Sequence, residues 1–106
     1  MTRELRTILA QLRHRFEALY GERLVRMVLY GSQARADAEA GSDIDVLVVL
    51  AGPVNPGLEI ARAGPATAEL SLEHDVVISC TFVSAQRYST ERSPLLLNVR
   101  REGVTI

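Results

Sequence analysis

The sequence lacks several features that define whole classes of protein. A single cysteine, Cys80, excludes an intramolecular disulfide. There is no lysine; the 12 basic residues are all arginine, and 13 acidic residues bring the net charge to −1, so no overall field attracts nucleic acid or an anionic membrane. No apolar run approaches the length of a membrane span. We therefore expect no membrane partner, no direct nucleic-acid partner and a cytoplasmic location.

The chain is also short. Its 106 residues predict a single domain, residues 1–106, that buries its core less completely than a longer enzyme does. A domain of this size gains stability from a partner, which can be a second protein or another copy of the chain.

The spacing of apolar residues predicts helices alternating with strands. Leu5, Ile8, Leu12 and Phe16 recur at the spacing of one helix face, with Thr2 as a cap and Gly21 as a stop. β-Branched and aliphatic runs predict strands. The expected strands are 24–30, 43–50, 74–83 and 104–106, and the later helices are 32–38, 58–73, 84–88 and 95–101. Gly64 and Pro65 are expected to kink or split the helix over 58–73.

Two short segments between predicted elements indicate a site. Gly31 follows the first strand and permits a sharp turn, and Ser32 is expected to cap a new helix whose first N–H groups can receive a phosphate. Asp43 and Asp45 open the second strand, where the two-residue repeat places both carboxylates on one face. Two adjacent carboxylates repel each other and need a cation, for which Mg²⁺ shared with a substrate's phosphates is suited.

These segments together resemble a known signature. Gly31-Ser32, ten intervening residues and Asp43-Ile44-Asp45 are similar to the signature of the DNA polymerase beta-like nucleotidyltransferases, and in particular to the minimal nucleotidyltransferase (MNT) family. Ala34-Arg35 and the ending from Ser93 to Val104 extend the resemblance over nearly the whole chain. Ala36 stands where the family commonly has glycine.

Pattern and resemblance together predict an α/β (α+β) fold. It has a small mixed sheet of about four strands, helices packed mainly on one face, and the acidic cluster on the open face. The resemblance implies two Mg²⁺ ions held by Asp43 and Asp45, with Asp75 on a neighbouring strand as a third ligand that helps to remove the acceptor's proton. Asp75 could instead be a solvated strand-entry residue, with Glu73 as its rival.

Nucleotide-binding roles follow from the same resemblance. Gly31 and Ser32 are expected to hold the β- and γ-phosphates of ATP or another NTP, with Arg35 adding a charge-assisted contact. Arg35 could equally be a surface residue that pairs with Asp37 or Glu39.

The resemblance implies three candidate functions. The first is an antitoxin that transfers AMP, or another NMP, to a hydroxyl, most simply a tyrosine of a helical HEPN-type toxin. The second is an antitoxin that neutralises such a partner by binding alone, which Ala36 favours and the retained acids oppose. The third is a transferase acting on a small molecule such as an aminoglycoside, which the lack of an acceptor-binding region disfavours. Base preference, acceptor and oligomeric state stay open.

Overall fold

A four-stranded mixed sheet in the order β3-β2-β1-β4 forms the centre of the structure. The computed structural model describes residues 1–39 and 41–106. The strands are β1 (Leu24–Tyr30), β2 (Ile44–Leu50), β3 (Ile78–Ser84) and β4 (Val104–Thr105). β1 pairs antiparallel with both β2 and β4, whereas β2 and β3 run parallel. The expected mixed sheet is therefore confirmed, with strand bounds that differ from the prediction mainly in β3.

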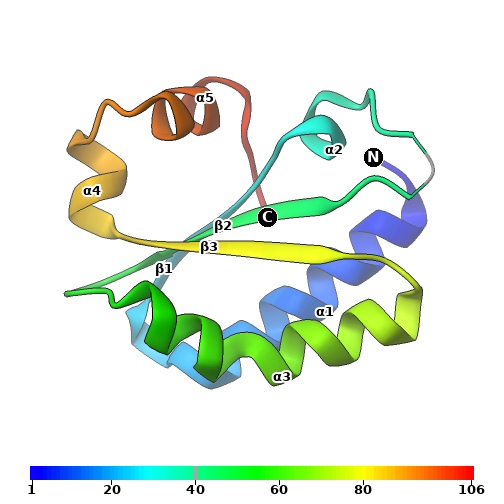
Figure 1. Ribbon diagram of the computed structural model, residues 1–106, viewed down its shortest axis with the longest axis horizontal. Helices are drawn as coiled ribbons and strands as arrows, with labels where there is room; N and C mark the ends of the chain where they lie inside the picture. Colours follow the sequence, from blue (N-terminus) through cyan, green and yellow to red (C-terminus); the bar gives the residue numbers. More distant parts are fainter. Residues whose placement is uncertain (40) are drawn as a thin grey trace.

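Two long helices cover one face of the sheet, below it in Figure 1. They are α1 (Arg3–Tyr20) and α3 (Pro56–His74). Thr2 caps α1 by accepting a hydrogen bond from the Leu5 N–H at 3.1 Å, and Gly21 ends it, both as predicted. Phe16 of α1 stacks on Phe82 of β3, with ring centroids 6.2 Å apart. The main core lies in this layer, between the two helices and the inward side chains of the strands.

The opposite face is covered only in part. The helices on this side are α2 (Ser32–Arg35), α4 (Ala85–Thr90) and α5 (Pro94–Glu102). Leu96 and Val99 of α5 form a second buried cluster there, together with Val28 of β1 and with Leu47 and Val49 of β2. The rest of this face, toward the start of β2, is left to polar side chains.

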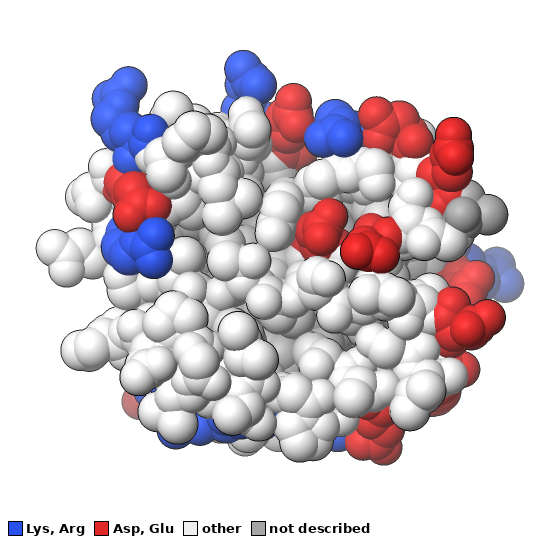
Figure 2. All heavy atoms as spheres, in the orientation of Figure 1, with Lys and Arg blue, Asp and Glu red and all other residues white. Residues whose placement is uncertain are grey.

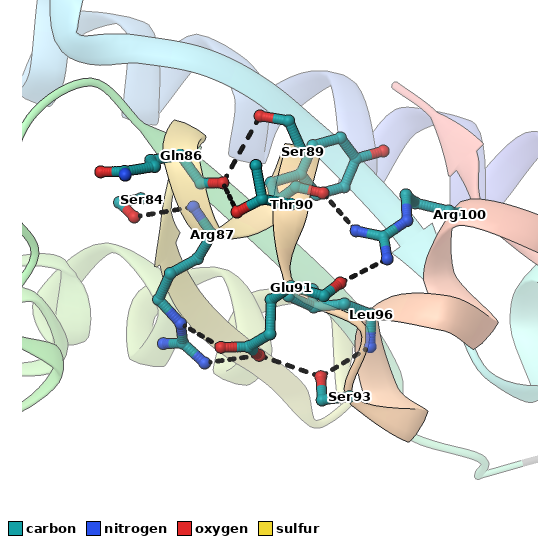
Figure 3. A network of polar contacts seen from close by, with 10 residues as sticks. Ser84, Gln86, Arg87, Ser89, Thr90, Glu91, Ser93, Leu96 and Arg100 are labelled. Carbon is teal, nitrogen blue, oxygen red and sulfur yellow. Dashed lines mark hydrogen bonds and ion pairs between the residues drawn. The ribbon is translucent and has the colours of Figure 1, made fainter.

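A polar network fixes α4 against α5 (Figure 3). Glu91 accepts two hydrogen bonds from Arg87, at 2.8 and 2.9 Å, and a third from the Ser93 hydroxyl at 2.9 Å. Ser93 caps α5 through the Leu96 N–H at 3.3 Å, and Arg100 donates to the backbone carbonyls of Tyr88 and Glu91. The hydrogen bonds from Arg87 and Ser93 lower the pKa of Glu91.

Of the kink or split expected at Gly64 and Pro65, the split is wrong. α3 runs from Pro56 to His74 as one element although Pro65 lies inside it. Its buried residues Ala63, Ala66 and Leu70 keep the spacing of one helix face on both sides of the proline. Burial of that continuous face against β3 and α1 outweighs the hydrogen bond that Pro65 cannot make.

Two further element predictions need correction. The helix expected over 32–38 ends at Arg35, because Ala36 adopts a left-handed conformation with φ 60° and ψ 24°. The strand expected from residue 74 begins only at Ile78, because α3 extends to His74 and Asp75 terminates it with φ 53°. Within the described ranges, no helix combines the length and the apolar character that crossing a bilayer requires.

Candidate active site

The turn after β1 is shaped around a carboxylate. Gly31 has φ 75° and ψ −157°, a conformation that is essentially restricted to glycine. A Cβ atom at Gly31 would lie 2.6 Å from Oδ2 of Asp45, closer than real Cβ atoms approach. The absence of a side chain at Gly31 therefore lets the backbone of the turn lie against Asp45. Ser32 begins α2 here, so Gly31 and not Ser32 occupies the cap position.

Asp43 and Asp45 lie together at the start of β2. Asp43 is exposed and directly precedes the strand, whereas Asp45 is half-buried within it. Burial, and then the nearby charge of Asp43, raise the pKa of Asp45. The loop before Asp43 is held by Gln33, whose amide donates to the Ser42 carbonyl at 3.3 Å. The structure thus brings the predicted acids and the Gly31 turn to one edge of the sheet.

The strand register places hydroxyl groups beside Asp45. Tyr30 of β1 and Ser79 of β3 are its direct partners in the antiparallel and parallel ladders. On β3 the residue two positions further, Thr81, shares this face, and its Oγ1 lies 3.3 Å from the Tyr30 hydroxyl. The sequence analysis missed all three residues. The signal for Ser79 and Thr81 was a polar alternation in the third strand, but the register that brings all three residues to Asp45 could not be known from the sequence.

Asp75 does not join the acidic pair. It is exposed at the end of α3, three residues before β3 begins, and so holds no place in the sheet ladder. Among the described residues, which exclude only Ala40, no three His, Cys, Asp or Glu side chains are arranged to hold one metal ion. The role of Asp75 as third ligand stays a prediction, and its expected position on a strand is wrong.

Arg35 reaches away from the turn. Its guanidinium pairs with Asp37 at 3.3 Å and with Glu102 of α5 at 3.4 Å. The hydrogen bond to Asp37 is the main reason that the pKa of Arg35 is raised. Of the surface pairings foreseen for Arg35, the structure shows the one with Asp37 and adds Glu102. Its nucleotide role stays a prediction.

The residues present fit one divalent ion better than two. Asp43 and Asp45 offer hard oxygen ligands on one face, and the backbone of the Gly31 turn lies against Asp45 with no side chain in between. Ser79 and Thr81 add neutral hydroxyls and no charge. A second ion would need a further carboxylate, and in the described part of the chain no three His, Cys, Asp or Glu side chains are grouped to hold a metal ion.

The surface around the site is unevenly charged (Figure 2). In this view most acidic and basic side chains lie along the upper, left and right margins, two acidic side chains lie just right of the centre, and much of the lower left is uncharged. Exposed apolar side chains occur on α3 and just before β3, including Leu58, Ile60, Leu72 and Val77.

Comparison with known proteins agrees with this geometry. A family profile described as "Nucleotidyltransferase domain" matches residues 6–97. The chain belongs to this family, as the resemblance of its motifs predicted. No sequence among the curated proteins matches the chain.

Solved structures show the same fold. A toxin-antitoxin crystal structure with AMP-PNP superposes with a TM-score of 0.65 at 16% identity, covering 98% of this chain and 72% of the other. A structure of a mutant MntA-HpeT toxin-antitoxin gives 0.62 at 16% identity, covering 98% and 71%. A structure described as a minimal nucleotidyltransferase, with that function unproven, gives 0.59 at 23% identity and covers 96% and 95%. At these identities the likeness establishes the fold alone.

Proposed function

We propose that this chain is a Mg²⁺-dependent nucleotidyltransferase that acts as the antitoxin of a toxin-antitoxin pair. In this proposal it binds ATP, or another NTP, and transfers the NMP group to a hydroxyl, most simply a tyrosine of a helical HEPN-type toxin. The observation that carries the proposal is the contact between the Gly31 turn and Asp45, beside Asp43, in a chain of the nucleotidyltransferase family.

The proposed roles follow from position. Gly31 and Ser32 receive the β- and γ-phosphates, because the turn brings backbone close to the carboxylates without a side chain in between. Asp43 and Asp45 hold a divalent ion. When bound, such an ion supplies positive charge to the phosphate oxygens. In contacting a phosphate, Arg35 exchanges its pairs with Asp37 and Glu102 for that contact.

The proposed reaction transfers a nucleotidyl group and changes no oxidation state. The acceptor oxygen forms a bond to the α-phosphorus, and the bond from that phosphorus to the bridging oxygen of the β-phosphate breaks. Pyrophosphate leaves with the electron pair. The acceptor's proton passes to a carboxylate at the site or to water.

The partner is proposed from the comparisons and from the surface. Two similar structures are described as toxin-antitoxin complexes, one of them with AMP-PNP. The exposed apolar side chains Leu58, Ile60 and Leu72 on α3 are of the kind that a second protein covers. We expect the chain to act where such a partner is made, in the cytoplasm.

A second candidate is favoured by one observation. Among the described residues no third His, Cys, Asp or Glu is grouped with another two to hold a metal ion, and Ser79 of β3 is the ladder partner of Asp45. An antitoxin that binds nucleotide and partner but transfers slowly or not at all would have such a site. No feature of the structure favours the small-molecule transferase.

Intact-mass spectrometry separates these functions. The chain is incubated with Mg²⁺-ATP and a HEPN-type protein that is its candidate partner, and the mass of that protein is measured. A gain of one or more AMP masses, abolished by Asp43→Ala, supports transfer. Neutralisation without a mass change, equally by wild type and Asp43→Ala, supports the binding antitoxin.

Asp75→Asn is the informative comparison in the same assay. The geometry predicts that this variant still transfers, because Asp75 lies at the end of α3. A steep loss of transfer in a folded Asp75→Asn variant would restore its predicted role as third ligand.

A further inference from the structure

The parallel pairing of β2 with β3 decides which side chain stands opposite Asp45. The register runs from Ile44 with Ile78 to Leu50 with Ser84 without a shift. Asp45 is thereby paired with Ser79, and the side chains of paired residues point to the same face of the sheet. The alternate residues of β3 agree with this orientation of Ser79: the side chains of Ile78 and Phe82 point to the opposite face, where they belong to the main core.

Ser79 is therefore the residue of β3 nearest to the acidic pair. Neighbouring strands lie about 4.8 Å apart, so a carboxylate at this position would come within the span of an ion ligated by Asp45. Serine offers a hydroxyl there, without charge. The next residue of β3 on this face, Thr81, is already near the Tyr30 hydroxyl, at 3.3 Å.

We propose that Ser79 limits this site to one divalent ion, so that the chain binds nucleotide with a single metal and a carboxylate at position 79 would create the second metal position. The proposal rests on the proposed function insofar as Asp43 and Asp45 hold the first ion. It departs from the two ions that the resemblance implies, and the reason is the charge of the donor set. Besides the phosphates of the nucleotide, the chain offers the carboxylates of Asp43 and Asp45, and Ser79 places a neutral hydroxyl where a further charged ligand for a second cation would lie.

Ion counting with Mn²⁺ tests the proposal without any assay of transfer. The protein is saturated with a non-hydrolysable ATP analogue, and protein-bound Mn²⁺ is counted by equilibrium dialysis and electron paramagnetic resonance. Ions of a two-metal site lie about 3.5–4 Å apart and couple magnetically. We expect one uncoupled ion in the wild type and two coupled ions in Ser79→Asp. Two coupled ions in the wild type would overturn the proposal.

Controls keep the outcomes distinct. Ser89→Asp makes the same change on the exposed surface of α4 and should bind one ion, as the wild type does. A count of one in a folded Ser79→Asp variant would overturn the role of position 79. A wild type that binds no ion, or binds as many as Asp43→Ala/Asp45→Ala, would instead overturn the proposed function. Because the wild-type count needs no variant, the test stands even if Ser79→Asp fails to fold.

Discussion

Oδ2 of Asp45 occupies the space that a side chain at Gly31 would require: a Cβ placed there would lie 2.6 Å from this oxygen. The turn after β1 and the start of β2 are thus fitted to each other at the edge of the sheet. The fit makes Gly31 a requirement of the site as well as of the turn.

Gly31→Ala should therefore weaken both folding and metal binding. The φ of 75° and ψ of −157° lie in a region open essentially to glycine alone, where strain is about 1–3 kcal/mol. The new methyl group must also displace the Asp45 carboxylate. Thermal melts and Mn²⁺ titration measure the two effects. Gly52→Ala is the matched control, because Gly52 has φ 79° but nothing within 4 Å of its Cβ position; it should lose stability and keep its metal affinity.

Ala36→Gly should stabilise the chain. Ala36 ends α2 with φ 60°, and a left-handed alanine is about 1–2 kcal/mol less stable than a right-handed one, a penalty that glycine escapes. We expect a rise in melting temperature of about 4 °C per kcal/mol regained. Ala34→Gly, inside the same helix and against the core, should lower the melting temperature. If Ala36→Gly lowers the melting temperature as much as Ala34→Gly does, or lowers it further, position 36 is not strained.

Glu59 should matter for stability far from the site. It is 2% exposed, accepts a hydrogen bond from the Tyr20 hydroxyl at 3.1 Å and pairs with Arg62 at 3.3 Å. Burial and this hydrogen bond raise the pKa of Tyr20. Glu59→Leu leaves the hydroxyl without its acceptor, which should lower the free energy of unfolding by about 1–3 kcal/mol in urea titrations. Glu59→Gln keeps an acceptor for the Tyr20 hydroxyl, so its free energy of unfolding should fall less. If both variants lose the same amount, the effect comes from the lost negative charge of Glu59 and not from the lost acceptor.

The raised pKa of Asp45 predicts two pH dependences. A carboxyl group with a higher pKa in the folded than in the unfolded chain favours folding below the unfolded pKa, about 3.9, and that contribution is lost as pH rises through the folded value. Without metal, Asp45→Asn should therefore gain stability over the wild type at pH 7, and the gain should vanish near pH 3.5. Melts across this range measure it. A gain that is constant with pH would contradict the assignment.

The affinity for a divalent metal ion should also depend on pH. Protons compete with the ion for Asp45, so the affinity of the wild type for Mn²⁺ should fall as the pH is lowered toward the pKa of this group. The affinity of Asp45→Asn should be weaker throughout and less dependent on pH.

Much of the fold could be predicted from the sequence because its signals are local. The spacing of Leu5, Ile8 and Leu12 with the cap at Thr2 defined α1, and the β-branched runs defined β1 and β2. The turn at Gly31 and the alternation of Asp43 and Asp45 likewise depend on neighbours in the chain. These local features predicted the part of the site that is formed by the Gly31 turn and the two aspartates.

What could not be predicted depends on contacts between distant segments. α3 stays whole past Pro65 because its buried face packs on β3 and α1, which no local rule reveals. From the sequence, His74 and Asp75 were predicted to begin a strand, but α3 continues through His74. The parallel register that puts Ser79 opposite Asp45 is likewise set by tertiary packing.

The most direct test of the account is calorimetric binding of a non-hydrolysable ATP analogue with Mg²⁺ to the wild type and to Asp43→Asn/Asp45→Asn. The paired carboxylates are the proposed metal ligands, so the folded double variant should bind the metal-nucleotide complex at least about 10-fold more weakly, with the thermal stability of the apo-protein unchanged or raised. Equal affinity in wild type and double variant would contradict the account, because the nucleotide would then bind somewhere other than the edge where Gly31 meets Asp45.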